Sequence, residues 1–71
     1  MTSMPDEARM SKADRLRVQD ALQRLGYYKE GLDGLFGPAT REAIRRFQGE
    51  IGAEKTGRLS AEEASRLVST H

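Results

Sequence analysis

Side chains that could hold a ligand gather between residues 27 and 48 of this chain. Tyr27 and Tyr28 are adjacent, and a tyrosine at a surface offers a flat apolar face together with a hydrogen-bonding hydroxyl. Because two adjacent tyrosines cannot both point inward, we predict that one packs in the core and that Tyr28 is the exposed one. The tyrosine pair therefore indicates binding.

An amide and a guanidinium follow on the next predicted helix. Arg41 and Gln48 fall within about 20° of each other at helical spacing, on the border between the apolar and charged sides. A guanidinium has the fork that matches a carboxylate, so the pair could grip one. The alternative for both residues is a solvated, charged helix face.

Side chains that catalyse hydrolysis are scarce. The chain has no cysteine, and its one histidine, His71, is the last residue and poorly placed to activate a serine. The spacing of His, Asp and Glu is not that of metal ligands. The sequence therefore predicts a chain that is not an enzyme and that carries no metal or cofactor.

The stretch GLDGLFGPAT, residues 31–40, holds three of the seven glycines. Gly31, Gly34 and Gly37 can all take positive φ without steric penalty, so the stretch predicts a structured loop. Gly34 and Gly37 are interpreted first as residues of backbone geometry. Ligand contact through their exposed amides is the alternative.

The sequence also predicts roles for the side chains of other residues in this loop. Asp33 precedes a glycine, which favours a turn in which its carboxylate accepts a backbone N–H two residues on. Recognition of an amide or amine on a peptide is the alternative for Asp33. Leu32, Leu35 and Phe36 are predicted to pin the loop onto the helices. A connection this specific usually has a function.

Apolar periodicity and capping signals predict three helices and no strand. The first begins at a capping box from Ser11 to Asp14 and stops at Gly26, the second begins at Pro38, and the third begins at a capping box from Ser60 to Glu63. The predicted fold is all-α, a small three-helix bundle with the glycine-rich loop between helices one and two. Residues 1–10 are predicted to be a flexible tail and residues 11–71 the domain.

Charge and hydrophobic composition argue against two further classes of function, nucleic-acid binding and membrane insertion. Twelve basic and eleven acidic residues give a formal charge of +1, which argues against nucleic-acid binding. No apolar run approaches the roughly 20 residues that cross a bilayer, so membrane insertion is not expected. The first ten residues lack the basic and apolar regions of a signal peptide.

The ordered set D-G-x-F-G-x-x-T-x-x-A-x-x-x-F-Q, which runs from Asp33 to Gln48, resembles the peptidoglycan-binding-like domain. The resemblance spans about residues 14 to 68 and includes the stretches LGYY (25–28) and TGRL (56–59). It implies a three-helix module of the kind common in bacterial cell-wall enzymes. After Gly52 the family usually has leucine, often followed by proline, whereas this chain has Ala53, Glu54 and Lys55, which puts the shape of any groove there in question.

The resemblance implies a non-catalytic module that binds peptidoglycan, through its stem peptide and amino sugars, and that targets an attached catalytic domain to its substrate. The expected location is the periplasm or cell wall, as part of an exported parent protein. The alternative is a module that docks on another protein or another domain of its own parent. The candidate ligand-binding residues are Tyr27, Tyr28, Asp33, Gly34, Gly37, Arg41 and Gln48.

Overall fold

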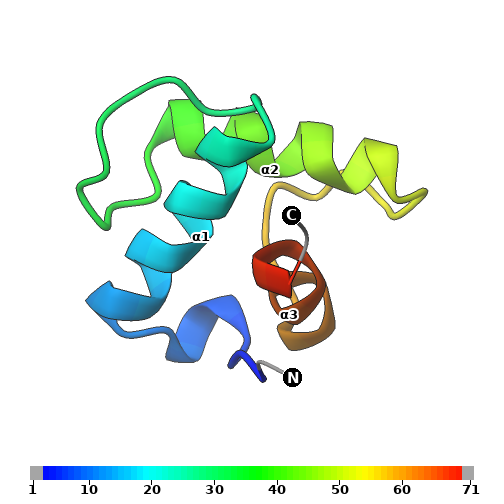
Figure 1. The fold of residues 1–71 in the computed structure, drawn as a ribbon. Coiled ribbons are helices and arrows are strands. Elements are labelled where there is room, and N and C mark those ends of the chain that lie inside the picture. Colours follow the sequence, from blue (N-terminus) through cyan, green and yellow to red (C-terminus); the bar gives the residue numbers. More distant parts are fainter. Residues whose placement is uncertain (1–2, 70–71) are drawn as a thin grey trace.

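Three helices form the fold, as predicted (Figure 1). The computed structural model describes residues 3–69, so the expectation about His71 lies outside the described residues. A short 3-10 helix, η1 (Glu7–Arg9), precedes α1 (Lys12–Arg24), α2 (Pro38–Glu50) and α3 (Ala61–Ser69). None of the helices in residues 3–69 has the length and apolar character that a membrane crossing requires.

Local capping signals set where the helices begin. Before α1, the Ser11 hydroxyl accepts the Asp14 N–H and the Asp14 carboxylate accepts the Ser11 N–H, both at 3.1 Å. Ser60 and Glu63 exchange the same two bonds at 3.1 Å before α3. Pro38 stands at the start of α2, where its missing N–H leaves no bond unmade. Both predicted capping boxes are confirmed.

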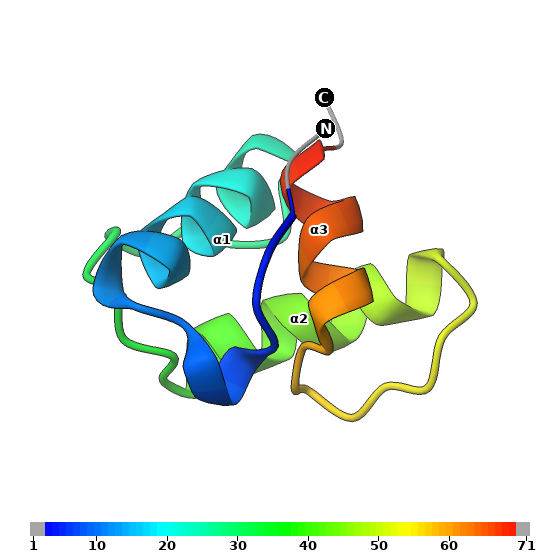
Figure 2. The ribbon, with the colours of Figure 1, turned by 90° about the horizontal axis from the view of Figure 1, so that it is seen from below.

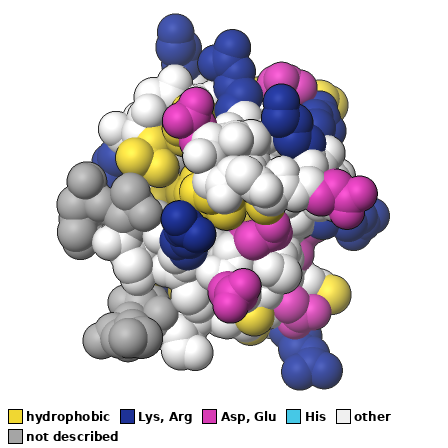
Figure 3. Space-filling model, turned by 90° about the vertical axis from the view of Figure 1, so that its right-hand side faces the viewer, with side chains coloured by type: hydrophobic (Ala, Val, Ile, Leu, Met, Phe, Trp, Pro, Cys, Tyr) yellow, Lys and Arg dark blue, Asp and Glu magenta, His cyan; other side chains and the backbone are white. Residues whose placement is uncertain are grey.

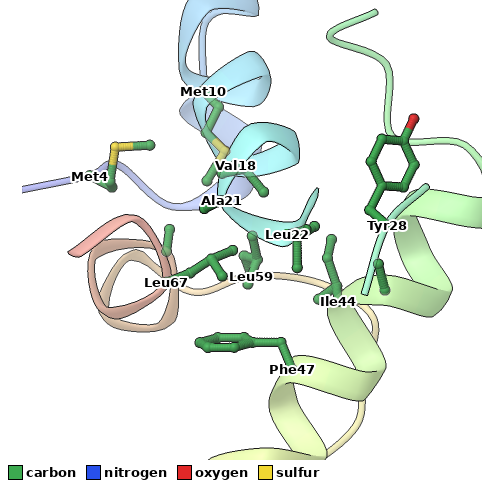
Figure 4. Close-up of a cluster of buried hydrophobic side chains, with 12 residues drawn as sticks. Met4, Met10, Val18, Ala21, Leu22, Tyr28, Ile44, Phe47, Leu59 and Leu67 are labelled. Atoms are coloured by element: carbon green, nitrogen blue, oxygen red, sulfur yellow. The ribbon is translucent and has the colours of Figure 1, made fainter. Parts of the chain in front are cut away.

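The core lies where the three helices meet, with α1 in contact with both α2 and α3. Figure 4 shows side chains from α1, α2, α3 and the N-terminal segment converging there, with Leu59 from the turn before α3 among them. Leu59 is 3% exposed, so the turn at residues 56–59 places it inside. The buried apolar residues are Met4, Met10, Val18, Ala21, Leu22, Tyr28, Ala43, Ile44, Phe47, Leu59, Ala64 and Leu67.

The N-terminal segment is packed, so the prediction of a flexible tail over residues 1–10 is wrong for the part that the structure describes. Met4 and Met10 are 4% and 6% exposed, and the Met4 N–H donates to the Ser65 hydroxyl at 2.8 Å. Figure 2 shows the segment running between α1 and α3. The polar composition of this segment predicted no packing, but two of its methionines, six residues apart, fill the space between these helices.

Glu7 ties this segment to α2 and to the turn before α3. Its carboxylate lies 2.6 Å from Nη1 of Arg41 and accepts the Leu59 N–H at 3.0 Å. Arg41 also donates to the Gly57 carbonyl at 3.0 Å and lies over the Phe36 ring, 5.5 Å from its centroid. One guanidinium thus joins the N-terminal segment to both interhelical loops.

Replacing Glu7 should therefore destabilise the fold. In Glu7→Ala the Leu59 N–H loses its acceptor and the Arg41 guanidinium keeps only the Gly57 carbonyl, so we expect the free energy of unfolding in urea to fall by about 1–3 kcal/mol. The control is Glu54→Ala, which removes an exposed glutamate and should change stability by less than about 0.5 kcal/mol. Equal effects of the two substitutions would contradict this role of Glu7.

Candidate ligand-binding groove

A buried glutamine holds the glycine-rich loop. Gln19 is fully buried on α1, and its Oε1 accepts the N–H groups of Asp33 and Gly34 at 3.1 and 2.8 Å. Its Nε2 lies within 3.2 Å of three acceptors: the Asp33 carboxylate, the Leu35 carbonyl and the Thr40 hydroxyl. One side chain thereby fixes the loop and the first turn of α2.

A second buried glutamine does the same for the loop between α2 and α3. Gln48 is fully buried, its Oε1 accepts the Gly57 N–H at 3.0 Å, and its Nε2 donates to the Arg58 carbonyl at 2.7 Å. Nε2 also lies 3.2 Å from the Thr56 hydroxyl and from the Glu63 carboxylate. Each bond has its counterpart at Gln19, so the chain contains two copies of one helix–loop unit.

The two loops share their backbone geometry as well. Gly34 and Gly57 have φ of +75° and +79°, the left-handed region that favours glycine. The residue before each accepts an N–H two residues on, the Asp33 carboxylate at 2.9 Å and the Thr56 hydroxyl at 3.1 Å. The predicted turn at Asp33 is thereby confirmed. Gly37, by contrast, has φ of −84° and precedes α2 in extended conformation.

A groove runs over the outer side of α2 between these two loops. It consists of two adjoining hollows of about 390 and 300 Å³ that share Tyr27 and Arg46. We call it the Tyr27–Arg46 groove. Its lining is Tyr27, Tyr28, Lys29 and Glu30 from the first loop, Ala39, Glu42, Arg46, Gly49 and Glu50 from α2, and Lys55 from the second loop.

The cations of this groove differ in what they contact. Arg45, the neighbour of Arg46 in the chain, pairs with Glu42 at 2.9 Å, whereas the Arg46 guanidinium makes no hydrogen bond or ion pair with any other residue in 3–69. Lys55 lies against Gly49, where a Cβ would come within 2.6 Å of its Cε. The surface toward the C-terminal end of α2 mixes basic, acidic and apolar side chains (Figure 3). Because Arg46 lines both hollows, its unpaired guanidinium lies where the two hollows meet.

The two tyrosines exchange the places that the sequence predicted. Tyr27 is partly exposed and lines both hollows. Tyr28 is only 5% exposed, and its hydroxyl donates to the Gly31 carbonyl at 2.6 Å. Figure 4 places Tyr28 at the edge of the core, with its hydroxyl directed away from the other side chains. The prediction that Tyr28 is the exposed one is therefore wrong. After α1, Gly26 turns the chain with a φ of +86°, the N–H groups of Tyr27 and Tyr28 both bond the Leu22 carbonyl, and the second ring turns inward.

The other predicted site residues do not line this groove. Gln48 is inside rather than on the border of α2, because its amide satisfies the second loop. Arg41 is on the border, as expected, but its guanidinium is held by Glu7. Asp33, Gly34 and Gly37 belong to the far part of the first loop. A ligand contact of any of the seven candidates stays a prediction.

Leu32 and Leu35 do not pin the loop. They are 42% and 65% exposed, the exposed large hydrophobic side chains of residues 3–69. Hydrogen bonds to Gln19 hold this loop, so its leucines are free to face solvent. Phe36 is partly buried against the core, as predicted.

Sequence reasoning missed Arg46 and Lys55. Arg46 was not among the candidate residues, because only its position beside Tyr27 distinguishes it from the other arginines of α2. The signal that was available is Gly49, an unusual residue inside a helix, which gives Lys55 room to lie across α2. Ala53, where the sequence departs from the family pattern, lines a separate hollow of about 280 Å³ beside α3.

Side chains for metal chemistry are not assembled. Within residues 3–69, no group of three or more His, Cys, Asp or Glu side chains could hold a metal ion. No buried side-chain nitrogen or oxygen in that part of the chain lacks a hydrogen-bond partner. The fold and the groove define a small all-α domain with a shallow surface site on its second helix.

Comparison with known proteins places this domain in a family. Residues 11–67 match the family described as "Putative peptidoglycan binding domain". The chain belongs to this peptidoglycan-binding domain family, which confirms the resemblance read from the sequence. The N-terminal segment that carries Met4, Glu7 and Met10 precedes the matched residues.

Similar proteins are much longer than this chain. The spore cortex-lytic enzyme of Halalkalibacterium halodurans is 37% identical over 80% of this chain and 17% of its own length. The localization factor PodJL of Caulobacter vibrioides is 43% identical over 70% of this chain and 5% of its own length. A crystal structure of SltB3 from Pseudomonas aeruginosa, in complex with NAG-anhNAM-pentapeptide, is 33% identical with a TM-score of 0.77, over 82% of this chain and 16% of that one.

Removing the first glutamine should loosen the loop and the fold. In Gln19→Ala the Gly34 N–H and the Leu35 carbonyl lose their partner, and we expect the free energy of unfolding in urea to fall by at least about 2 kcal/mol. The matched control is Gln23→Ala, an exposed glutamine on the same helix, with an expected change below about 0.5 kcal/mol. A loss at Gln19 no larger than at Gln23 would show that the amide does not hold the loop.

Acid should weaken the same loop. The Leu35 N–H and then the Gln19 amide lower the pKa of Asp33 below its ordinary value of 3.8. The stability that Asp33 contributes is therefore fully present above 3.8 and is lost as pH falls from there through the lower pKa of the folded state. NMR titration of the carboxyl carbon should find this low pKa. Asp33→Asn should reduce the loss of stability between about pH 4 and 2, and an unchanged pH dependence would contradict the assignment.

Proposed function

We propose that this domain is a non-catalytic module that binds peptidoglycan in the Tyr27–Arg46 groove. The observation that carries the proposal is a partly exposed tyrosine and an unpaired arginine side by side on a rigid support. The Tyr27 ring offers an apolar face for a sugar ring or an alanyl methyl group. Membership of the peptidoglycan-binding family supports the same ligand.

Rigidity of the two loops favours binding. Gln19 and Gln48 hold the two loops from which the walls of the groove come before a ligand arrives, so we expect little conformational entropy to be lost when one binds. Weak binding suffices for a module that is attached to a catalytic domain, since the tether raises the effective concentration of enzyme on a polymeric substrate. We propose that such a parent protein acts in the periplasm or at the cell wall. The similarity to a cortex-lytic enzyme supports this proposal.

A second candidate function is docking on another protein or on another domain of the parent. The observation that favours it is the exposure of Leu32 and Leu35 on a loop that Gln19 holds rigid. Exposed leucines on a fixed loop suit an apolar contact surface. Similarity to a protein named as a localization factor is consistent with it.

Retention on insoluble peptidoglycan distinguishes the two functions. Tyr27→Ala should reduce retention about three- to tenfold in a sedimentation assay, because the apolar platform is lost. Its circular dichroism spectrum should keep the helical signal. Leu35→Ala is the control, since it removes an exposed side chain outside the groove and should leave retention unchanged.

Other outcomes would reassign the site. Loss of retention with Leu35→Ala and not with Tyr27→Ala would move the binding surface to the glycine-rich loop. No sedimentation of the unaltered chain with peptidoglycan would contradict wall binding and favour docking. Tyr28→Ala is unsuited to this assay, because truncating a buried ring destabilises the domain itself.

A further inference from the structure

The three arginines of α2 have different surroundings, and the difference points to a ligand group. Arg41 is held by the Glu7 carboxylate and the Gly57 carbonyl, and Arg45 is held by Glu42. Arg46 is exposed and has no hydrogen-bond or ion-pair partner within residues 3–69. It is thus the arginine of this helix whose fork is available to a ligand.

The surroundings of Arg46 fit a negative group. It lies at the junction of the two hollows, and Lys55 lines the larger hollow beside it, with Glu50 as the acidic residue of that hollow. Lys29 and Glu30 both line the smaller hollow, where the Glu42 carboxylate is already paired with Arg45. The cations of the larger hollow therefore outnumber its acids, and a carboxylate is the anion whose geometry matches a guanidinium.

We propose that Arg46, with Lys55 beside it, binds the free terminal carboxylate of a peptidoglycan stem peptide, while the residue before the terminus lies on the Tyr27 ring. This inference rests on the proposed wall-binding function and adds the chemical group that is recognised. An amide bond at that carboxyl, such as a cross-link makes, removes both the charge and the second acceptor oxygen. The module therefore prefers peptide ends that are not cross-linked.

A second source of carboxylate exists in the same polymer, the lactyl group of muramic acid where no peptide is attached. Both carboxylates have a small apolar group next to them, but an ether oxygen joins the lactyl group to a bulky sugar ring, whereas a peptide terminus continues into a slender extended backbone. Ala39 leaves the α2 side of the smaller hollow, which Arg46 also lines, with little side-chain bulk, and this suits an extended peptide end lying along the helix. We therefore place the peptide terminus at Arg46.

Matched soluble probes test this assignment. N-acetyl-D-alanyl-D-alanine, its C-terminal amide and N-acetylmuramic acid are titrated into the chain and followed by amide chemical shifts at low salt. The free acid should bind about three- to tenfold more tightly than the amide, with shifts at Tyr27, Arg46 and Gly49. Higher ionic strength should reduce this preference.

Variants identify the residue responsible. Arg46→Gln should remove the preference for the free acid, and Arg46→Lys should retain only part of it, because lysine keeps the charge without the fork. Arg17→Gln is the matched control: Arg17 is exposed on α1, away from the groove, and its loss should leave the preference intact.

The outcomes separate this inference from the proposed function. Retention on peptidoglycan with equal binding of acid and amide, or tighter binding of N-acetylmuramic acid than of the dipeptide, would overturn the carboxyl-terminal assignment and leave wall binding standing. Preference for the free acid that survives Arg46→Gln would overturn the role of Arg46. No response to any probe and no retention on peptidoglycan would overturn both.

Discussion

The rest of this structure depends on one kind of interaction: a glutamine side chain whose amide group is fully buried and fully hydrogen-bonded. A glutamine presents an acceptor and a donor side by side, as a peptide group does, so it can pair with a loop that has no neighbouring strand. Gln19 pairs with the N–H of Gly34 and the carbonyl of Leu35, and Gln48 pairs with Gly57 and Arg58 in the same way. A buried amide left unpaired would be costly, which makes the loop conformation and the helix packing depend on each other.

The groove follows from this pairing. Two helix–loop units of the same design follow one another along the chain, and α2 belongs to both, since it receives the first loop at its start and sends out the second from its end. Tyr27 and Lys55, one from each loop, therefore line the larger hollow together with residues of α2. A recognition surface thus arises from two loops that have no regular secondary structure of their own.

Local signals predicted most of the fold and little of the site. The capping boxes at Ser11 and Ser60 and the turn at Asp33 are decided by residues two or three apart, so the sequence alone indicated them correctly. The burial of Tyr28 and of Gln48 depends on which loop reaches them, and periodicity along one helix carries no such information. The family resemblance supplied the architecture, and the packing decided the exposure of individual side chains.

The sequence could not show which arginine of α2 is available to a ligand, for the same reason. Arg41 and Arg46 are equally basic and equally forked, and helical spacing favoured Arg41. Its partner Glu7 lies 34 residues earlier, in a segment whose composition suggested no structure at all. Contacts across the whole chain therefore determine which guanidinium remains for a ligand.

The bond between the Met4 N–H and the Ser65 hydroxyl has a consequence for how such a domain is joined to others. This bond is 2.8 Å long and holds the N-terminal segment beside α3. A domain whose first and last segments are adjacent can be inserted into a surface turn of a host protein without distorting either protein. Such a domain also suits circular permutation, in which its two ends are joined and the chain is opened at another place.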